Sequence, residues 1–305
     1  MGRLDGFALR VAPRRHTGPD ARFPVRSTPM CAVKISWPNV CGMATPPMFT
    51  LTRGSGVPLL LIHGMGSSSA TWAPVLDALS ARRSVIALDL PGFGKSAPLD
   101  GPVTIATLSD AVQSFIDSEG LAGVDIVGSS MGARMALELA RRGIGGNVVA
   151  LDPGGFWTPR QRRIFEVTIG ASMKLTRRLQ RALPALTGNP VGRTVLLGQF
   201  SAHPWSLPAP LVLAELRAFA AATSVDEAFD ALAHGPDQEG APAGSTPGEI
   251  VIGWGRQDKI TFPSQAAAAI ERFPDASLHW FDKCGHFPHW DQPEQAADLI
   301  LASTG

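Results

Sequence analysis

Residues 125–143, DIVGSSMGARMALELARRG, change character at the short run GSSMG. Apolar, β-forming residues precede this run, and apolar residues at helical spacing follow it. A strand must therefore give way to a helix within a few small residues. Ser130 lies at the apex, between Gly128 and Gly132. The flanking residues are glycines because a larger side chain there would strike the neighbouring strand or helix. The stretch predicts an elbow that lifts the hydroxyl of Ser130 clear of a sheet.

Short apolar runs alternate with helical ones from residue 50 onward. Strands are expected at 58–64, 84–90, 124–130, 147–153, 249–255 and 277–283, and helices at 71–82, 104–119, 131–142, 264–272 and 292–302. Most of the strand runs are apolar along both faces, which favours strands buried in a parallel sheet between two layers of helices. The pattern predicts an α/β fold with right-handed crossovers.

One long interval breaks this alternation. Residues 155 to about 236 contain no convincing strand, and their apolar residues recur at helical spacing. We therefore expect a core made of residues 48–154 and 246–305, with a helical cap and connector at 155–245. The proline-rich and basic residues 1–47 are expected to be a disordered extension.

Composition limits the possible partners. The net charge of +1 gives no reason to expect a nucleic acid, and no apolar run is long enough to span a bilayer. The three cysteines, Cys31, Cys41 and Cys284, are too widely spaced to form a disulfide framework or a metal cluster. We expect a cytoplasmic protein that acts on a small molecule and needs no metal or organic cofactor. The sequence does not indicate an oligomeric state.

A serine hydroxyl becomes a good nucleophile only when a base removes its proton. His286 follows the last expected strand, in KCGHFPHWDQPEQ, and a loop there can reach across the carboxyl edge of the sheet to the elbow. We therefore expect His286 to be the base for Ser130.

The base in turn needs an acceptor that holds its tautomer. Asp258, in GWGRQDKI just beyond a strand, is the expected acceptor. Asp152 is its main rival, because it follows the preceding strand at a similar edge position, and Asp282 and Asp291 are further alternatives.

Two backbone N–H groups are expected to stabilise an oxyanion. The first strong strand ends in HGMG, a turn that can aim the N–H of Met65 at the substrate. The N–H of Met131 lies at the start of the helix after the elbow, where negative charge is favoured.

Taken in the order Ser130, Asp258 and His286, these motifs resemble the α/β-hydrolase family over residues 50–303. HGMG looks like the family's oxyanion loop, DLPGFGKS like the following turn, GSSMG like its nucleophile elbow, GRQD like its acid loop and GHFPHWDQPE like its base loop. The resemblance implies a mostly parallel sheet with helices on both faces and a helical cap insertion. GFGKS also looks like the end of a phosphate-binding loop, but Asp89 occupies the position of the required glycine.

The resemblance implies a serine hydrolase that cleaves an ester or related acyl compound through an acyl-enzyme. A serine at the apex and the absence of tyrosine argue against the haloalkane dehalogenases and epoxide hydrolases of the family. GSSMG, WGRQD and GHFPHW are also similar to the meta-cleavage-product hydrolases, which cleave carbon–carbon bonds with the same triad. A third alternative is a non-catalytic ligand-binding protein of the same fold.

The cap is expected to set specificity. The apolar candidates for substrate contact are Trp157, Met173 and Phe287, with Phe200, Trp205 and Phe219 as further possibilities. Two arginine groups, Arg160, Arg162 and Arg163 and then Arg177, Arg178 and Arg181, could attract an acidic substrate or form a solvated helix face.

Overall fold

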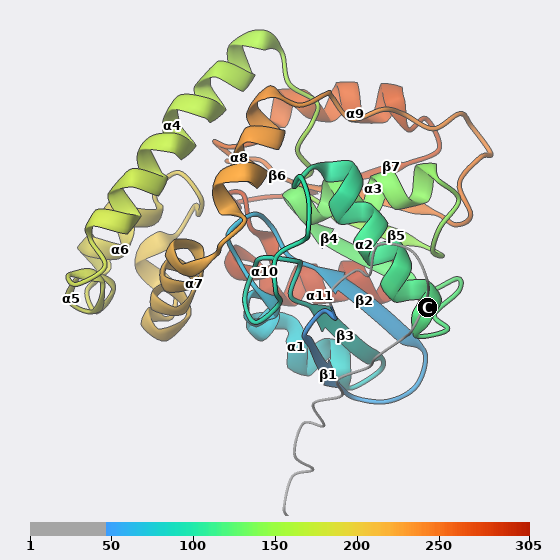
Figure 1. The fold of residues 1–305 in the computed structure, drawn as a ribbon, viewed down its shortest axis with the longest axis horizontal. Helices are drawn as coiled ribbons and strands as arrows, with labels where there is room; N and C mark the ends of the chain where they lie inside the picture. Colours follow the sequence, from blue (N-terminus) through green and yellow to red (C-terminus); the bar gives the residue numbers. More distant parts are fainter. Residues whose placement is uncertain (1–46) are drawn as a thin grey trace, which may run out of the picture. The chain divides into compact units, whose positions relative to one another are not determined.

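Seven strands form one sheet in the computed structural model, which describes residues 47–305. The sheet order is β1-β3-β2-β4-β5-β6-β7, and all neighbours are parallel except the edge strand β1, which is antiparallel to β3 (Figure 1). The strands are β1 (Thr50–Arg53), β2 (Pro58–Ile62), β3 (Ser84–Leu88), β4 (Asp125–Ser129), β5 (Val148–Leu151), β6 (Ile250–Gly255) and β7 (Ser277–Phe281). The predicted α/β fold is confirmed. The extension expected at 1–47, with Cys31 and Cys41, lies outside the described residues apart from residue 47.

Helices cover both faces of this sheet (Figure 1). They are α1 (Ala73–Ser80), α2 (Ile105–Ser118), α3 (Met131–Arg141), α9 (Ala266–Arg272), α10 (Pro288–Asp291) and α11 (Pro293–Ser303), with short 3₁₀ helices η1 (Ser69–Trp72) and η3 (Pro263–Gln265). A third 3₁₀ helix, η2 (Pro204–Ser206), lies in the interval between β5 and β6. Leu60 and Ile62 pack with residues of α2, α3 and α9, whereas Leu59 and Leu61 pack with those of α1 and α11. Successive strand residues point to opposite faces, so an apolar core on both sides requires the uninterrupted apolar runs of the sequence.

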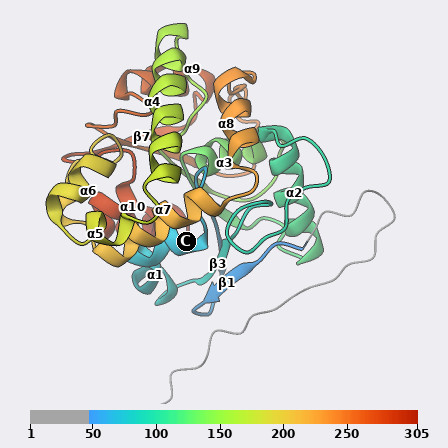
Figure 2. The ribbon, with the colours of Figure 1, turned by 60° about the vertical axis from the view of Figure 1, so that its left-hand side comes forward.

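The interval between β5 and β6 is helical. It contains α4 (Pro159–Arg178), α5 (Leu183–Thr187), α6 (Pro190–Leu197), α7 (Ala209–Ala221) and α8 (Val225–His234), and Figure 2 shows α4 to α7 grouped together. Thr158 begins α4 with a capping box, in which its hydroxyl accepts from the N–H of Gln161 and the Gln161 side chain accepts from the N–H of Thr158. The inserted helices share a small apolar cluster that also contains Trp290 of α10. Among residues 47–305, no helix is both long and apolar enough to cross a lipid bilayer.

Candidate active site

The elbow between β4 and α3 has an unusual backbone. Ser130 has φ 56° and ψ −114°, a combination that side chains rarely allow. A Cβ atom on Gly132 would lie 2.2 Å from the carbonyl oxygen of Ile62 and 2.5 Å from that of His63. A Cβ on Gly128 would lie 2.2 Å from the carbonyl oxygen of Gly132. Both flanking positions therefore exclude every residue except glycine, which is the steric reason for the pattern.

Three side chains from separate loops meet at this elbow. The Nε2 atom of His286 lies 2.8 Å from the Oγ atom of Ser130, and its Nδ1 atom lies 2.8 Å from Oδ2 of Asp258. Asp258 also accepts hydrogen bonds from the hydroxyl of Thr261 (2.6 Å) and the N–H of Ile260 (2.7 Å). The Nδ1–H group of His286 donates its hydrogen bond to this carboxylate, which leaves Nε2 free to accept the proton of the serine. This arrangement can activate the Ser130 hydroxyl.

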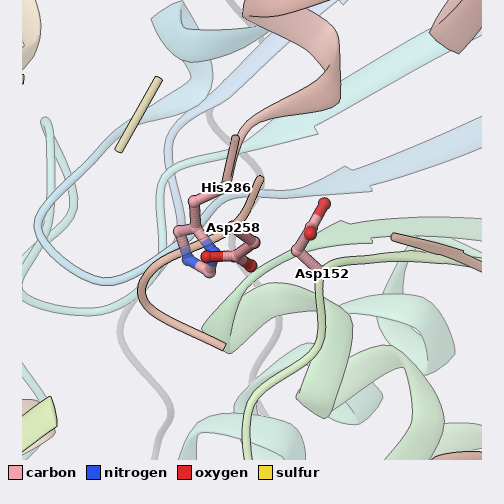
Figure 3. Close-up of side chains that lie close together, drawn as sticks. All are labelled: Asp152, Asp258 and His286. Carbon is pink, nitrogen blue, oxygen red and sulfur yellow. The ribbon is translucent and has the colours of Figure 1, made fainter. Parts of the chain in front are cut away.

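Asp152, the main rival, has a different partner. Its Oδ1 accepts from the N–H of Gly255 (2.8 Å), and its side chain is completely buried. Figure 3 shows the Asp258 carboxylate at the imidazole of His286, with Asp152 to one side of the pair. Burial and the negative charge of Asp258 raise the pKa of the Asp152 carboxyl well above its usual range. Asp152 therefore holds its proton more tightly than an ordinary aspartate and does not contact the imidazole.

Asp152, Asp258 and His286 offer possible metal-ligand atoms within 4.8 Å of one another. However, the oxygens of Asp258 already accept hydrogen bonds from Ile260, Thr261 and His286. The last of these bonds also uses the Nδ1 atom of the imidazole. The cluster is thus suited to orient the imidazole rather than to bind a metal ion.

The two remaining acidic alternatives have structural roles. Asp291 accepts from the N–H of Gly285 (2.7 Å) and the N–H of Ala202 (2.7 Å), so it ties the loop before His286 to the inserted segment. Asp282 is exposed and forms an ion pair with Arg256.

The turn after β2 lies directly beside the elbow. A Cβ on Gly64 would be 3.2 Å from the Cβ of Ser130, so the glycine allows the two segments to approach. Met65 lines the same cavity as Ser130. Met131 is the first residue of α3, and the N–H at that position has no partner inside the helix. Met65 therefore faces Ser130 across the cavity, and Met131 follows it in the chain at the start of α3.

His63 holds this turn in place, a role that its sequence context did not reveal. Its Nδ1 donates to the carbonyl oxygen of Gly64 (2.7 Å), and its Nε2 accepts from the N–H of Leu90 (3.0 Å). Burial lowers the pKa of His63, so the ring is neutral. A signal was present, because a histidine at the end of a buried strand needs two partners inside the protein.

A cavity of about 300 Å³ opens at Ser130 and His286. Core loops and inserted helices both line it, and Phe287, Phe200 and Phe219 supply apolar walls. The sequence analysis named all three as candidates for substrate contact, and that role stays a prediction.

Trp157, Met173 and Trp205 require a correction, because none of them is among the residues that line this cavity. Trp157 packs against the ring of Phe165, with a centroid separation of 4.9 Å, and Met173 is only 4% exposed within the same core. Apolar residues at helical spacing fill the space between helices here. Trp205 is 50% exposed at the surface.

The arginine groups form ion pairs away from the cavity. Arg177 pairs with Asp226 (2.9 Å), Arg162 pairs with Asp237, and Arg163 pairs with Glu166. None of the six arginines lines the cavity, so they do not provide a charged wall for an acidic substrate.

Comparisons with known proteins agree with this geometry. The model of the family described as "Alpha/beta hydrolase family" matches residues 59–299. A 2-hydroxymuconate semialdehyde hydrolase of Pseudomonas putida is 33% identical over 263 residues, which cover 81% of this chain and 87% of that protein. A 2-hydroxy-6-oxononadienedioate/2-hydroxy-6-oxononatrienedioate hydrolase of Dechloromonas aromatica is 28% identical, with coverage of 81% and 87%. The solved structure of a thermophilic esterase from Thermogutta terrifontis has the same fold, with a TM-score of 0.66, 22% identity and coverage of 85% and 94%.

Proposed function

The chain belongs to the α/β-hydrolase family, and from this premise we propose that it is a serine hydrolase that cleaves an ester or related acyl compound. One observation carries the proposal. The hydrogen bonds that join Ser130 to His286 and His286 to Asp258 are each 2.8 Å long, and they meet at the wall of a cavity. A protein that only binds its ligand has no need of an aligned nucleophile and base.

The reaction follows from these contacts. His286 Nε2 takes the proton of Ser130 as Oγ attacks the substrate carbonyl, and the N–H groups of Met65 and Met131 stabilise the oxyanion. The imidazolium then gives its proton to the leaving group, and an acyl-enzyme forms. His286 next removes a proton from water, which attacks the acyl carbon. The imidazolium then returns this proton to Oγ as the carbon–oxygen bond breaks, so the acid product leaves and Ser130 is regenerated. Asp258 stabilises the imidazolium in both halves of the reaction.

In this proposal residues 155–245 form a cap over a core of residues 48–154 and 246–305. The inserted helices supply Phe165, Leu216 and Phe219 to the cavity wall, while the core supplies the reacting groups. The cap therefore determines which acyl groups reach Ser130.

Carbon–carbon bond cleavage is the second candidate. It is supported by the 33% identity to a relative named as a 2-hydroxymuconate semialdehyde hydrolase. The same three residues would serve it, so only the substrate distinguishes the two reactions.

Labelling of the serine tests the proposal. The purified protein, its Ser130→Ala variant and the control Ser114→Ala, at an exposed serine of α2, are treated with a fluorophosphonate probe, and their intact masses are compared. We expect one adduct on the wild type and on the control, and none on Ser130→Ala. The labelled enzyme is then compared with the unlabelled enzyme on p-nitrophenyl hexanoate and on a dienoate that loses its visible absorbance on cleavage. The absence of an adduct from all three proteins, together with no turnover, would reject the proposal in favour of a binding protein.

A further inference from the structure

A buried carboxyl lies in the wall of the cavity. Glu215, on α7, is only 7% exposed, and its Oε2 accepts a hydrogen bond of 2.7 Å from the hydroxyl of Ser67. Ser67 lies just beyond the turn that carries Met65, and both residues line the cavity together with Ser130. An acidic group of the cap thus shares a chamber with the nucleophile.

Within residues 47–305, no positive side chain forms an ion pair with this carboxyl. Among the described residues that line the cavity, none is arginine or lysine, and His286 is the only group that can gain a positive charge. The partners of Glu215 are the neutral hydroxyls of Ser67 and Thr71, and the nearby Asp89 has a charge of the same sign. Burial raises the pKa of Glu215 to about 7. The free carboxyl is therefore close to half ionised at neutral pH.

We propose that Glu215 is a specificity-determining residue that excludes acyl groups bearing a carboxylate, so that the enzyme acts on uncharged acyl compounds. The inference rests on the proposed function. A carboxylate that entered this cavity would lose its water, find no cation and meet a second buried carboxylate.

The sequence contained no sign of this role. A single glutamate in the helical run PLVLAELRAFAAA is normally a solvated residue, and only the fold turns Glu215 inward.

A matched pair of substrates tests the inference. p-Nitrophenyl hexanoate and the p-nitrophenyl monoester of adipic acid have acyl chains of equal length, but the second ends in a carboxylate. We expect the wild type to have a kcat/KM about 100-fold higher for hexanoate at about pH 8, because like charges in a desolvated site repel strongly. In Glu215→Gln this ratio should fall at least about tenfold. Glutamine keeps an oxygen that accepts from Ser67, so the contact between cap and core is retained. The control is Glu227→Gln, at an exposed carboxylate of α8, which should leave the ratio unchanged.

The pH dependence of the ratio separates a charge effect from a structural one. The titratable groups that surround Glu215 are Asp89, His286 and, through Thr71, His289. A change that affects only the reacting groups enters the kcat/KM of both esters as the same factor and cancels in the ratio. As the pH falls through about 7, the wild-type ratio should fall because Glu215 becomes neutral, whereas the Glu215→Gln ratio should stay flat.

The outcomes are distinct. A wild-type ratio near one, or the same ratio in Glu215→Gln and wild type, would overturn the inference and leave the hydrolase proposal intact if hexanoate is cleaved and Ser130 is labelled. The absence of both labelling and ester cleavage would overturn the proposed function and, with it, the inference.

Discussion

The backbone of Ser130 leads to a stability prediction that separates strain from chemistry. Its φ of 56° and ψ of −114° place a residue with a Cβ atom in a sparsely populated region, at a cost of about 1–3 kcal/mol. Two substitutions remove the hydroxyl and its hydrogen bond to His286 equally. Ser130→Ala keeps the Cβ atom and the strain, whereas Ser130→Gly removes both.

The difference between the two variants can be estimated. Glycine relieves about 1–3 kcal/mol of strain, but it loses about 0.5–1 kcal/mol more conformational entropy than alanine on folding. Ser130→Gly should therefore be more stable than Ser130→Ala by roughly 1 kcal/mol. At an ordinary helical position the order is reversed, because glycine is the weaker helix former by about 0.8–1.0 kcal/mol.

Urea unfolding followed by tryptophan fluorescence measures both free energies of unfolding under identical conditions. The control is the same pair of substitutions at Ser114, an exposed residue inside α2, where alanine should be the more stable variant. The reasoning is refuted if Ser130→Gly is less stable than Ser130→Ala by the margin seen at Ser114. Neither Ser130 variant should hydrolyse esters, so activity cannot account for the difference.

Four further predictions concern the surroundings of the triad. Asp258→Asn should lower kcat/KM about 10³–10⁴-fold because the wrong tautomer of the base is favoured, whereas Asp152→Asn should lower it less than about tenfold. Because the pKa of Asp152 is raised in the folded protein, its stabilising contribution is present at low pH and is lost as the pH rises above about 4. In urea unfolding, the free energy of unfolding of Asp152→Asn should therefore increase with pH relative to that of the wild type. A difference that stays constant with pH would contradict this. Gly132→Ala would place a Cβ 2.2 Å from the carbonyl oxygen of Ile62, and thermal unfolding should reveal a loss of about 2–3 kcal/mol rather than the gain usual for glycine to alanine in a helix. Burial lowers the pKa of His289 to about 3, so its stabilising contribution is present above about pH 6.5 and is lost as the pH falls. Between pH 6.5 and 4, His289→Gln should therefore lose less stability than the wild type, by about a few kcal/mol. Parallel curves of unfolding free energy against pH would count against this account.

The central strands could be predicted from the sequence because burial on both faces is written into their composition. Leu59 to Ile62 pack alternately into two separate cores, and each core requires an apolar residue. The edge strand Thr50–Arg53 was not predicted. Two of its residues are exposed, and it is a strand only because Thr50 to Arg53 pair with β3. That pairing depends on residues more than thirty positions away, which a local pattern does not contain.

The residues of the candidate site also differ in how far the sequence could predict them. Ser130 and His286 could be selected because each follows a strong strand and belongs to a recognisable motif. The sequence favoured Asp258 as the acceptor but kept Asp152 as a rival, since the two residues follow neighbouring parallel strands and reach the same edge of the sheet. Only the three-dimensional contacts distinguish them. Asp152 accepts a hydrogen bond from the N–H of Gly255, whereas Asp258 accepts one from the imidazole of His286.

The position of the base depends on the inserted helices as well as on the core. The backbone N–H of His286 donates to the carbonyl oxygen of Phe200, which belongs to the insertion, at 2.7 Å. On the other side of the site, a Cβ on Gly66 would lie 2.0 Å from the ring of Phe219, so α7 rests directly on the turn after β2. The loop that carries His286 and the turn after β2 are thus both packed against the insertion. A substitution that shifts α7 or the segment at Phe200 must therefore change the geometry of the reacting groups as well as the shape of the cavity. For this reason kcat and KM should change together in such variants, whereas a substitution that alters only the charge of Glu215 acts on the choice between substrates.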